Sequence, residues 1–227
     1  MGELEQAEAS LTARRASPRG TVRVGVTTAF GLFLAEHLAP LLWANRGLKV
    51  ALFVGDDLRN MADEGLDLAL RVGTVEETGL IERHLGEVPR ILVAAPAYLA
   101  DHGVPVKAGD LLRHDCIGYG YGPAPVRWHI DGCDFAVAGQ FRVNSSEALQ
   151  RAAVAGLGIA LLPLFHVASQ ISAGNLLAVM PASRIDPLSL SIVHRAQIRL
   201  PERSRAVLDY IVGCFDAAIL KVPILAT

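Results

Sequence analysis

Two threonines lie where a predicted strand gives way to a predicted helix, and they form a candidate anion site. The stretch Gly20–Gly31 reads GTVRVGVTTAFG: valines alternate with other residues, as in a strand, and Thr27 and Thr28 then precede an amphipathic run that begins at Ala29. A helix start presents free backbone N–H groups at its positive end, and two hydroxyls beside it suit a small anion. The junction also has a purely structural explanation, because capped helices follow strands in most α/β proteins.

An arginine at the end of another predicted strand is a second candidate. Arg71 follows the apolar part of the strand 67–72, and the carboxyl ends of parallel strands are where open α/β sheets bind their ligands. A salt bridge to Asp67 or Glu64 would explain the same arginine without any ligand.

Two polar clusters later in the chain have the same two explanations. Tyr119 and Tyr121 alternate with glycines, so both rings would be able to lean over one face of a ligand, or one of them would pack structurally. Asn144, Ser145 and Ser146 precede a predicted helix and would give a second helix start suited to an anion. Ordinary capping also accounts for these three residues.

The hydrophobic pattern that must position these residues predicts two successive α/β units. The first is a right-handed βαβαβ unit with strands at 21–26, 48–54 and 67–72, a helix at 29–45, and a short helix from Asp56 or Asp57 to Gly65. The second has extended chain over 80–95, helical turns at 97–103, a hairpin around Asp131 and Gly132, a helix at 146–156, a strand at 158–162, a helix ending at Gly174, a strand at 188–194 and a final helix at 201–220. A crossing near Val93 and a return near Ile192 predict two lobes joined by two strands.

Composition limits the classes of function. The chain has 227 residues, of which 52% are hydrophobic and 19% charged, and a formal charge of −2 gives no basic field for nucleic acid. The three cysteines Cys116, Cys133 and Cys214 share no close spacing, which indicates neither a disulfide framework nor a zinc site. The N-terminus lacks the apolar core of a signal peptide and no apolar run reaches membrane-spanning length, so a cytoplasmic protein without a membrane partner is expected.

No residue set supports catalysis or metal binding. The seven histidines form no pair with the spacing of metal ligands, and no serine lies in a nucleophile elbow. Gly156 and Gly158 lie after a helix and before a strand, the reverse of the dinucleotide-binding order, so they are interpreted as a helix end. We therefore expect no enzyme activity and no cofactor.

A series of sequence pieces from about Glu3 to Ile219 follows the order of one known family. The pieces are a helical AEASL segment ending in ASPRG, then TVRVGVTTAFG, EGLDLALRVG, VAAPAYLADHG, LLRHDCIGY, a strand ending at Asn144, ALQRAAVAGLGIALLP and RAVLDYI. Together they resemble the effector-binding domain of LysR-type transcriptional regulators. The resemblance implies an α/β fold of two Rossmann-like lobes joined by two crossover strands, similar to type 2 periplasmic binding proteins.

The resemblance also implies domain boundaries. Residues 1–19 would be the end of a linker helix, 20–93 and 194–227 the first lobe, and 94–193 the second lobe. The winged helix-turn-helix by which family members bind DNA is expected to be absent from this chain.

Family members bind an inducer between the lobes, and the matching positions give the implied site. These positions are Thr27, Thr28, Ala29, Asp56, Arg71, Tyr119, Tyr121, Asn144, Ser145 and Ser146. The implied ligand is a small organic effector, a carboxylate or an aromatic compound. Promoter DNA would be bound only through the missing N-terminal domain, with RNA polymerase as a further partner. The alternative is a solute-binding protein of a transport system, which would need export.

The resemblance and the apolar pattern together predict a homodimer or tetramer. The helix between Phe30 and Trp43 is apolar around much of its circumference, and the segment SEALQRAAVAG offers small residues on the other lobe. Two chains related by a two-fold axis would pair these helices. The alternative is that the second face of the first helix packs under the C-terminal helix, around Tyr210 and Phe215.

Overall fold

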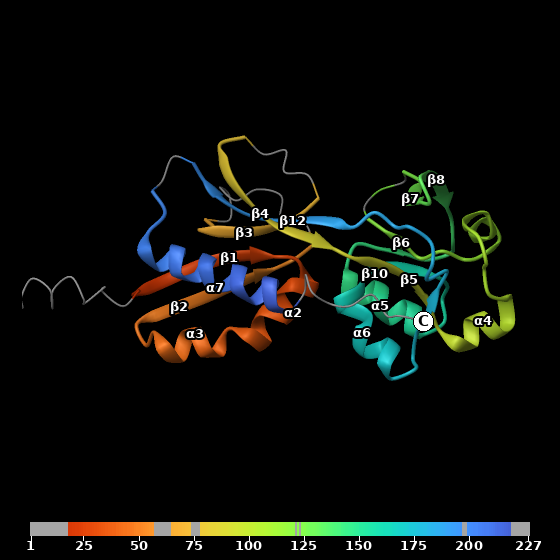
Figure 1. Cartoon of the computed structure of the whole chain (residues 1–227), viewed down its shortest axis with the longest axis horizontal. Coiled ribbons are helices and arrows are strands. Elements are labelled where there is room, and N and C mark those ends of the chain that lie inside the picture. The colour runs from red at the N-terminus through yellow and green to blue at the C-terminus, as the bar shows by residue number, and fades with distance from the viewer. Residues whose placement is uncertain are drawn as a thin grey trace, which may run out of the picture.

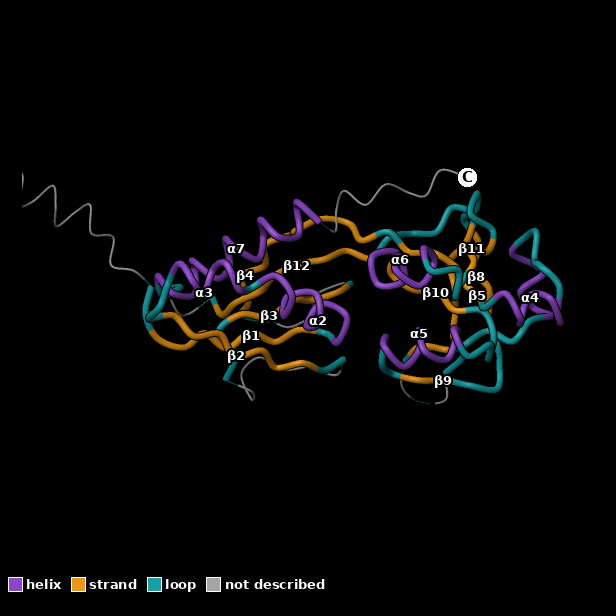
Figure 2. The backbone as a smooth tube through the Cα atoms, turned by 90° about the horizontal axis from the view of Figure 1, so that it is seen from below, coloured by secondary structure: helices purple, strands orange, loops and turns teal. Residues whose placement is uncertain are grey.

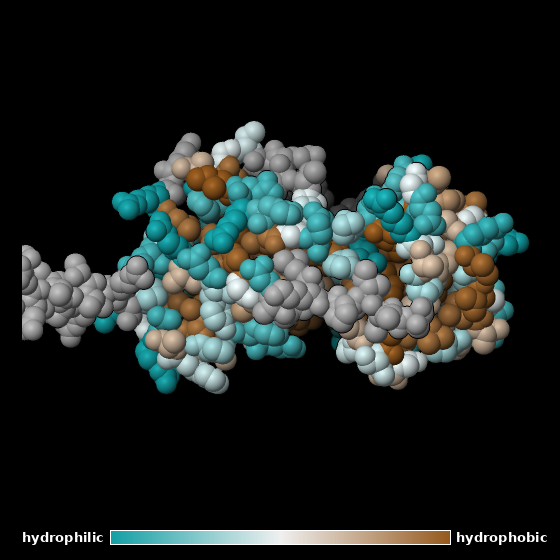
Figure 3. Space-filling view, viewed as in Figure 1, coloured by the Kyte–Doolittle hydropathy of each residue, from teal (hydrophilic) through white to brown (hydrophobic). Residues whose placement is uncertain are grey.

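The chain folds into two lobes, each built on its own β-sheet (Figure 1). A computed structural model describes residues 18–56, 65–73, 78–120, 122, 124–196 and 199–218. The predicted helix ahead of Ser17, the predicted short helix after Asp56, and Tyr121 therefore lie outside the described residues. The described part contains no helix that is long and apolar enough to cross a membrane. On the face drawn in Figure 3, hydrophilic and hydrophobic residues are interspersed over both lobes.

Lobe I is the part of the chain built on a five-stranded sheet of order β2-β1-β3-β12-β4. Its strands are β1 (Gly20–Val26), β2 (Leu48–Val54), β3 (Leu68–Val72), β4 (Leu80–Val88) and β12 (Leu188–Arg195). β1 pairs in parallel with β2 and β3, whereas β12 runs antiparallel to β3 and β4. The alternating valines of β1 are fully buried, which confirms the strand predicted from them.

Three helices cover the sheet of lobe I: α2 (Thr28–His37), α3 (Ala39–Ala44) and α7 (Glu202–Ala218). The sequence predicts one helix over 29–45, and this prediction is wrong at its centre. Pro40 has no N–H donor and is tolerated only in the first turn of a helix, so α2 ends at His37 and α3 begins anew at Ala39.

Lobe II is built on a three-stranded antiparallel sheet of order β10-β5-β11. Its elements are β5 (Arg90–Ala94), α4 (Pro96–His102), the 3₁₀ helix η1 (Ala108–Arg113), β6 (Gly118–Tyr119), β7 (Val126–Ile130), β8 (Cys133–Val137), β9 (Arg142–Val143), α5 (Ser146–Val154), β10 (Ala160–Pro163), α6 (Leu164–Ser172) and β11 (Leu177–Val179). The predicted hairpin is confirmed: β7 and β8 pair around Asp131 and Gly132, whose φ angles of 52° and 78° fit a type I′ turn.

Two adjacent strands connect the lobes. β4 and β12 pair along the sheet of lobe I, and Figures 1 and 2 show them extending toward lobe II. The chain leaves the first sheet after Val88 and joins the second at Arg90, and β12 belongs to the first sheet from Leu188 onward. Both crossings therefore lie a few residues earlier than the predicted positions near Val93 and Ile192. As a result, β5 belongs to lobe II and β12 to lobe I. The Nε of Arg90 donates to the carbonyl oxygen of Asp186 at 2.8 Å, which ties the two crossings together.

Candidate functional site

A cavity of about 500 Å³ lies between the two lobes, next to the crossing strands. This volume is in the range of sites that bind small organic molecules. Both lobes contribute to the wall, which is formed by Thr27, Ala29, Phe30, Gly55, Asp56, Leu70, Arg71 and Val72 of lobe I, by Arg90, Tyr119, Val126, Arg127, Trp128, Ser146, Leu149, Leu161, Leu162 and Pro163 of lobe II, and by Leu188 at the start of β12.

Most of this wall is apolar. Phe30 and Leu70 come from the buried face of lobe I, and Trp128, Leu149 and Leu162 come from the buried parts of lobe II. The strands and helices hold these side chains in place, because each also belongs to the packed interior of its lobe. A cavity of this composition suits the apolar or aromatic body of a ligand.

Three arginines contribute to the wall of the same cavity. The Nε of Arg90 also donates to the Asp186 carbonyl, and the Nε of Arg127 lies 3.8 Å from a carboxylate oxygen of Asp134. Arg71 lies on β3 opposite Ser191 of β12, Arg90 begins β5, and Arg127 lies on β7. Burial lowers the pKa of the Arg90 guanidinium, and the nearby Asp186 opposes that shift. Arginine stays protonated in proteins, so the wall offers cationic donors to an acid group.

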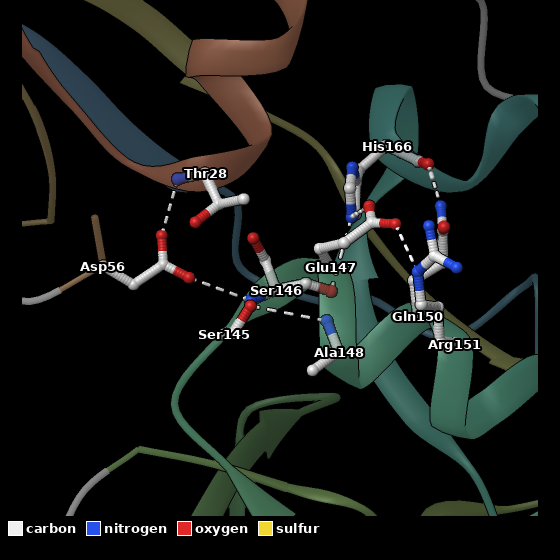
Figure 4. A network of polar contacts seen from close by, with 9 residues as sticks. All are labelled: Thr28, Asp56, Ser145, Ser146, Glu147, Ala148, Gln150, Arg151 and His166. Carbon is white, nitrogen blue, oxygen red and sulfur yellow. Dashed lines mark hydrogen bonds and ion pairs between the residues drawn. The ribbon is translucent and has the colours of Figure 1, made fainter. Parts of the chain in front are cut away.

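The carboxylate of Asp56 connects the two lobes at the cavity edge (Figure 4). Its Oδ1 accepts the backbone N–H of Thr28 at 2.7 Å, and its Oδ2 accepts the backbone N–H of Ser146 at 2.9 Å. Thr28 is the first residue of α2 and Ser146 the first residue of α5. The two helix starts predicted to suit an anion therefore both bind a carboxylate that belongs to the chain itself.

His166, whose side chain is 7% exposed, lies beside the start of α5. The Nε2 of His166 lies 3.3 Å from the carbonyl oxygen of Ser146 and 3.8 Å from a carboxylate oxygen of Glu147. Burial lowers the pKa of His166, although the Ser146 carbonyl, Glu147 and Asp56 act in the opposite direction. Because a carbonyl oxygen only accepts, the Nε2 of His166 is the donor in its hydrogen bond with Ser146.

The structure places most of the predicted site residues together. Thr27, Ala29, Asp56, Arg71, Tyr119 and Ser146 line the cavity, whereas Thr28, Asn144 and Ser145 are not part of its wall. Thr28 contributes its backbone N–H to Asp56, Ser145 caps α5 by accepting the Ala148 N–H at 3.4 Å, and Asn144 is exposed. Tyr121 lies outside the described residues. Of the two alternative partners of Arg71, Asp67 accepts the backbone N–H of Arg23 at 2.8 Å, and Glu64 lies outside the described residues.

Sequence reasoning missed the other thirteen residues of the wall, among them Phe30, Arg90, Arg127 and Trp128. The sequence does carry a signal for Trp128: the alternation of Val126, Trp128 and Ile130 along β7 indicates that these side chains share one face. In the structure Trp128 and Ile130 are buried on that face. No comparable signal marks Arg90, whose position depends on where the chain crosses between the lobes.

The fold and this cavity define a class of protein: a two-lobed α/β ligand-binding domain of the type 2 periplasmic-binding-protein kind. The LysR substrate binding domain family matches residues 15–214, and the chain belongs to this family. It is thus an effector-binding domain of the kind found in LysR-type regulators.

Named relatives agree with this assignment. The HTH-type transcriptional activator AaeR of Escherichia coli K12 is 30% identical over 223 residues, which cover 94% of this chain and 71% of AaeR. The structure of the LysR-type regulator CrgA from Neisseria meningitidis superposes with a TM-score of 0.80 at 26% identity, covering 93% of this chain and 74% of CrgA. The CrgA regulatory domain alone gives a TM-score of 0.78 over 86% of this chain and 98% of that domain. These relatives are transcriptional regulators, which does not favour the alternative of a transport receptor.

Proposed function

We propose that the cavity between the lobes binds a small organic acid with an apolar, aromatic body, and that this binding is the signal sensed by a transcriptional regulator. The observation that carries the proposal is the combination of apolar side chains with Arg71, Arg90 and Arg127 in the wall of one cavity. Apolar burial would supply much of the affinity, and charge-assisted hydrogen bonds would select an acid over a neutral analogue.

Ligand binding would act on the relation between the lobes. A ligand that touches both walls binds better to the closed arrangement than to an open one, so it shifts the population toward closure. In the regulator that we propose, this shift would be passed to an N-terminal DNA-binding domain, and promoter DNA and RNA polymerase would be contacted outside the present chain.

A thermal-shift screen of small aromatic carboxylates, each paired with its neutral amide, tests the ligand class. Benzoate and benzamide form the simplest pair. The best acid, at about 100 times its Kd, should stabilise the fold by about 2.7 kcal/mol and raise the Tm by about 5–10 °C. Its amide should give less than half of that shift, because it cannot form ion pairs with the guanidinium groups. An amide that stabilises as strongly as its acid would contradict the proposal.

We also propose that the chain forms a dimer through α2 and α3 of one copy and α5 of the other. The alternative, in which this helix packs under the C-terminal helix α7, accounts for part of the surface of α2. Phe33 packs against Phe215 of α7, and the Tyr210 hydroxyl donates to the His37 carbonyl at 2.7 Å. Two large apolar side chains nevertheless stay outside this packing, since Leu32 is 49% exposed and Trp43 67% exposed. Covering them against a second copy would remove apolar surface from water.

Sedimentation equilibrium in the micromolar range tests this pairing. We expect the mass of two chains, and Trp43→Glu should weaken the dimer by about 30-fold or more, as loss of a central tryptophan does at many interfaces. The matched control is Val106→Glu, which places the same charge at a valine that is 84% exposed near η1 in lobe II and should leave the dimer intact. The mass of a single chain across this range would rule out a stable dimer.

A further inference from the structure

The position of the Asp56 carboxylate is unusual because its two oxygens serve different lobes. Oδ1 accepts from Thr28 of lobe I and Oδ2 accepts from Ser146 of lobe II, at 2.7 and 2.9 Å (Figure 4). Asp56 itself follows the end of β2 in lobe I. The Asp56 side chain therefore forms a polar link between α2 and α5. This link is separate from the connection that β4 and β12 make between the lobes.

The link has the electrostatics of an anion site. α2 has 10 residues and α5 has 9, and each presents its first-turn N–H groups and the positive end of its dipole to the same carboxylate. Thr27, at the N-cap of α2, makes no cap hydrogen bond through its side chain, and Asp56 accepts the N–H of Thr28, one of the first-turn donors that have no partner within the helix. The Ser146 hydroxyl at the same place is buried and has no hydrogen-bond partner among the described residues.

An aromatic contact holds the lobes together beside the polar link. Phe165 of α6, in lobe II, stacks on Phe30 of α2 with ring centroids 5.1 Å apart, and it packs against the core of lobe I. The ring of Phe33 lies edge-on to that of Phe165, with ring centroids 6.4 Å apart. The lobes are therefore joined at α2 both by this aromatic contact and by the partly buried, charge-assisted hydrogen bonds of Asp56.

We propose that Asp56 is a built-in anion that joins α2 to α5 and excludes the acid group of an effector from the two helix starts. The exclusion of an effector rests on the proposed function of the cavity. Because the donors of Thr28 and Ser146 are taken, the acid group of a bound effector faces the guanidinium side of the cavity. Asp56 is in this sense a positioning residue that determines the orientation of the ligand.

A chemical-rescue experiment tests the proposal without any effector. Asp56→Ala should lower the Tm and leave an empty anion position, so acetate at about five times its Kd should raise the Tm of this variant by about 2–4 °C more than chloride of equal ionic strength. Wild type, whose own carboxylate fills the position, should respond equally to both salts. Asp67→Ala is the matched control, because Asp67 also accepts a backbone N–H, at 2.8 Å from Arg23, but does not line the cavity between the lobes.

Acetate that stabilises the wild type or Asp67→Ala as much as Asp56→Ala would overturn the proposal, as would an Asp56→Ala variant that acetate does not stabilise. Neither result would affect the effector screen, which has its own acids and amides.

Amide hydrogen exchange measured by NMR gives a second test that does not depend on rescue. Asp56→Asn keeps one acceptor oxygen and puts an NH₂ donor in place of the other. Exchange should therefore become about tenfold faster or more at one of the two amides, Thr28 or Ser146, and stay slow at the other. Unchanged exchange at both amides would show that the carboxylate does not protect them and would overturn the proposal.

Discussion

Phe215→Ala is expected to lower the free energy of unfolding by about 3–5 kcal/mol. Phe215 lies on α7 and is fully buried. Its ring centroid lies 5.4 Å from that of Phe30 and 5.3 Å from that of Phe33. Truncation would leave a cavity between α7 and α2 that the surrounding aromatic rings cannot fill. Urea denaturation followed by circular dichroism measures the change.

Phe141→Ala is the matched control, because Phe141 is 39% exposed and precedes the short strand β9. We expect it to cost less than about 1 kcal/mol. A Phe215→Ala variant no less stable than the Phe141→Ala variant would show that α7 does not seal the core of lobe I.

Local pattern was enough to predict most of the fold. The alternating valines of β1, the Asp131–Gly132 turn and the amphipathic stretch of α7 each follow from neighbours within a few residues, and the structure confirms all three. Proline also acts locally, but the apolar periodicity on both sides of Pro40 favours one continuous helix and hides the break. The crossings between the lobes were displaced by a few residues, since sheet membership depends on partners that are distant in sequence.

The site could be predicted only in part, for the same reason. A strand end followed by a helix start is visible in the sequence, and of the two threonines that it indicates, Thr27 lines the cavity and Thr28 does not; Arg71, predicted at the end of its strand, also lines it. The resemblance indicated Tyr119 and Ser146 of lobe II, but the position of Arg90 depends on where the chain crosses between the lobes, and no local pattern shows that.

Asp56 shows a further limit of the sequence. Resemblance placed it in the site, but no local pattern indicates that its two oxygens bind the starts of two helices from different lobes. The sequence correctly indicated that both helix starts suit a carboxylate. It could not indicate that the chain supplies this carboxylate itself.

If the proposed function is right, we expect recognition of an effector to depend strongly on Arg71. Arg71 lines the cavity from the centre of the lobe I sheet, between β1 and β12. Arg71→Ala should weaken binding of the best acid from the screen by about 10- to 150-fold, because a hydrogen bond between charged groups contributes about 1.5–3 kcal/mol. Arg71→Lys keeps the charge without the planar fork and should recover only part of the affinity.

Isothermal titration calorimetry of these variants measures the loss. Arg113→Ala is the matched control, since the Arg113 side chain is 80% exposed on η1 and pairs with Asp110 outside the cavity. It should bind the acid with wild-type affinity. An Arg71→Ala variant that keeps the wild-type Tm without ligand and binds within twofold of wild type would place the acid group away from Arg71. A selective loss at Arg71 would instead support an effector held by its acid group on the guanidinium side, opposite the helix starts that Asp56 fills.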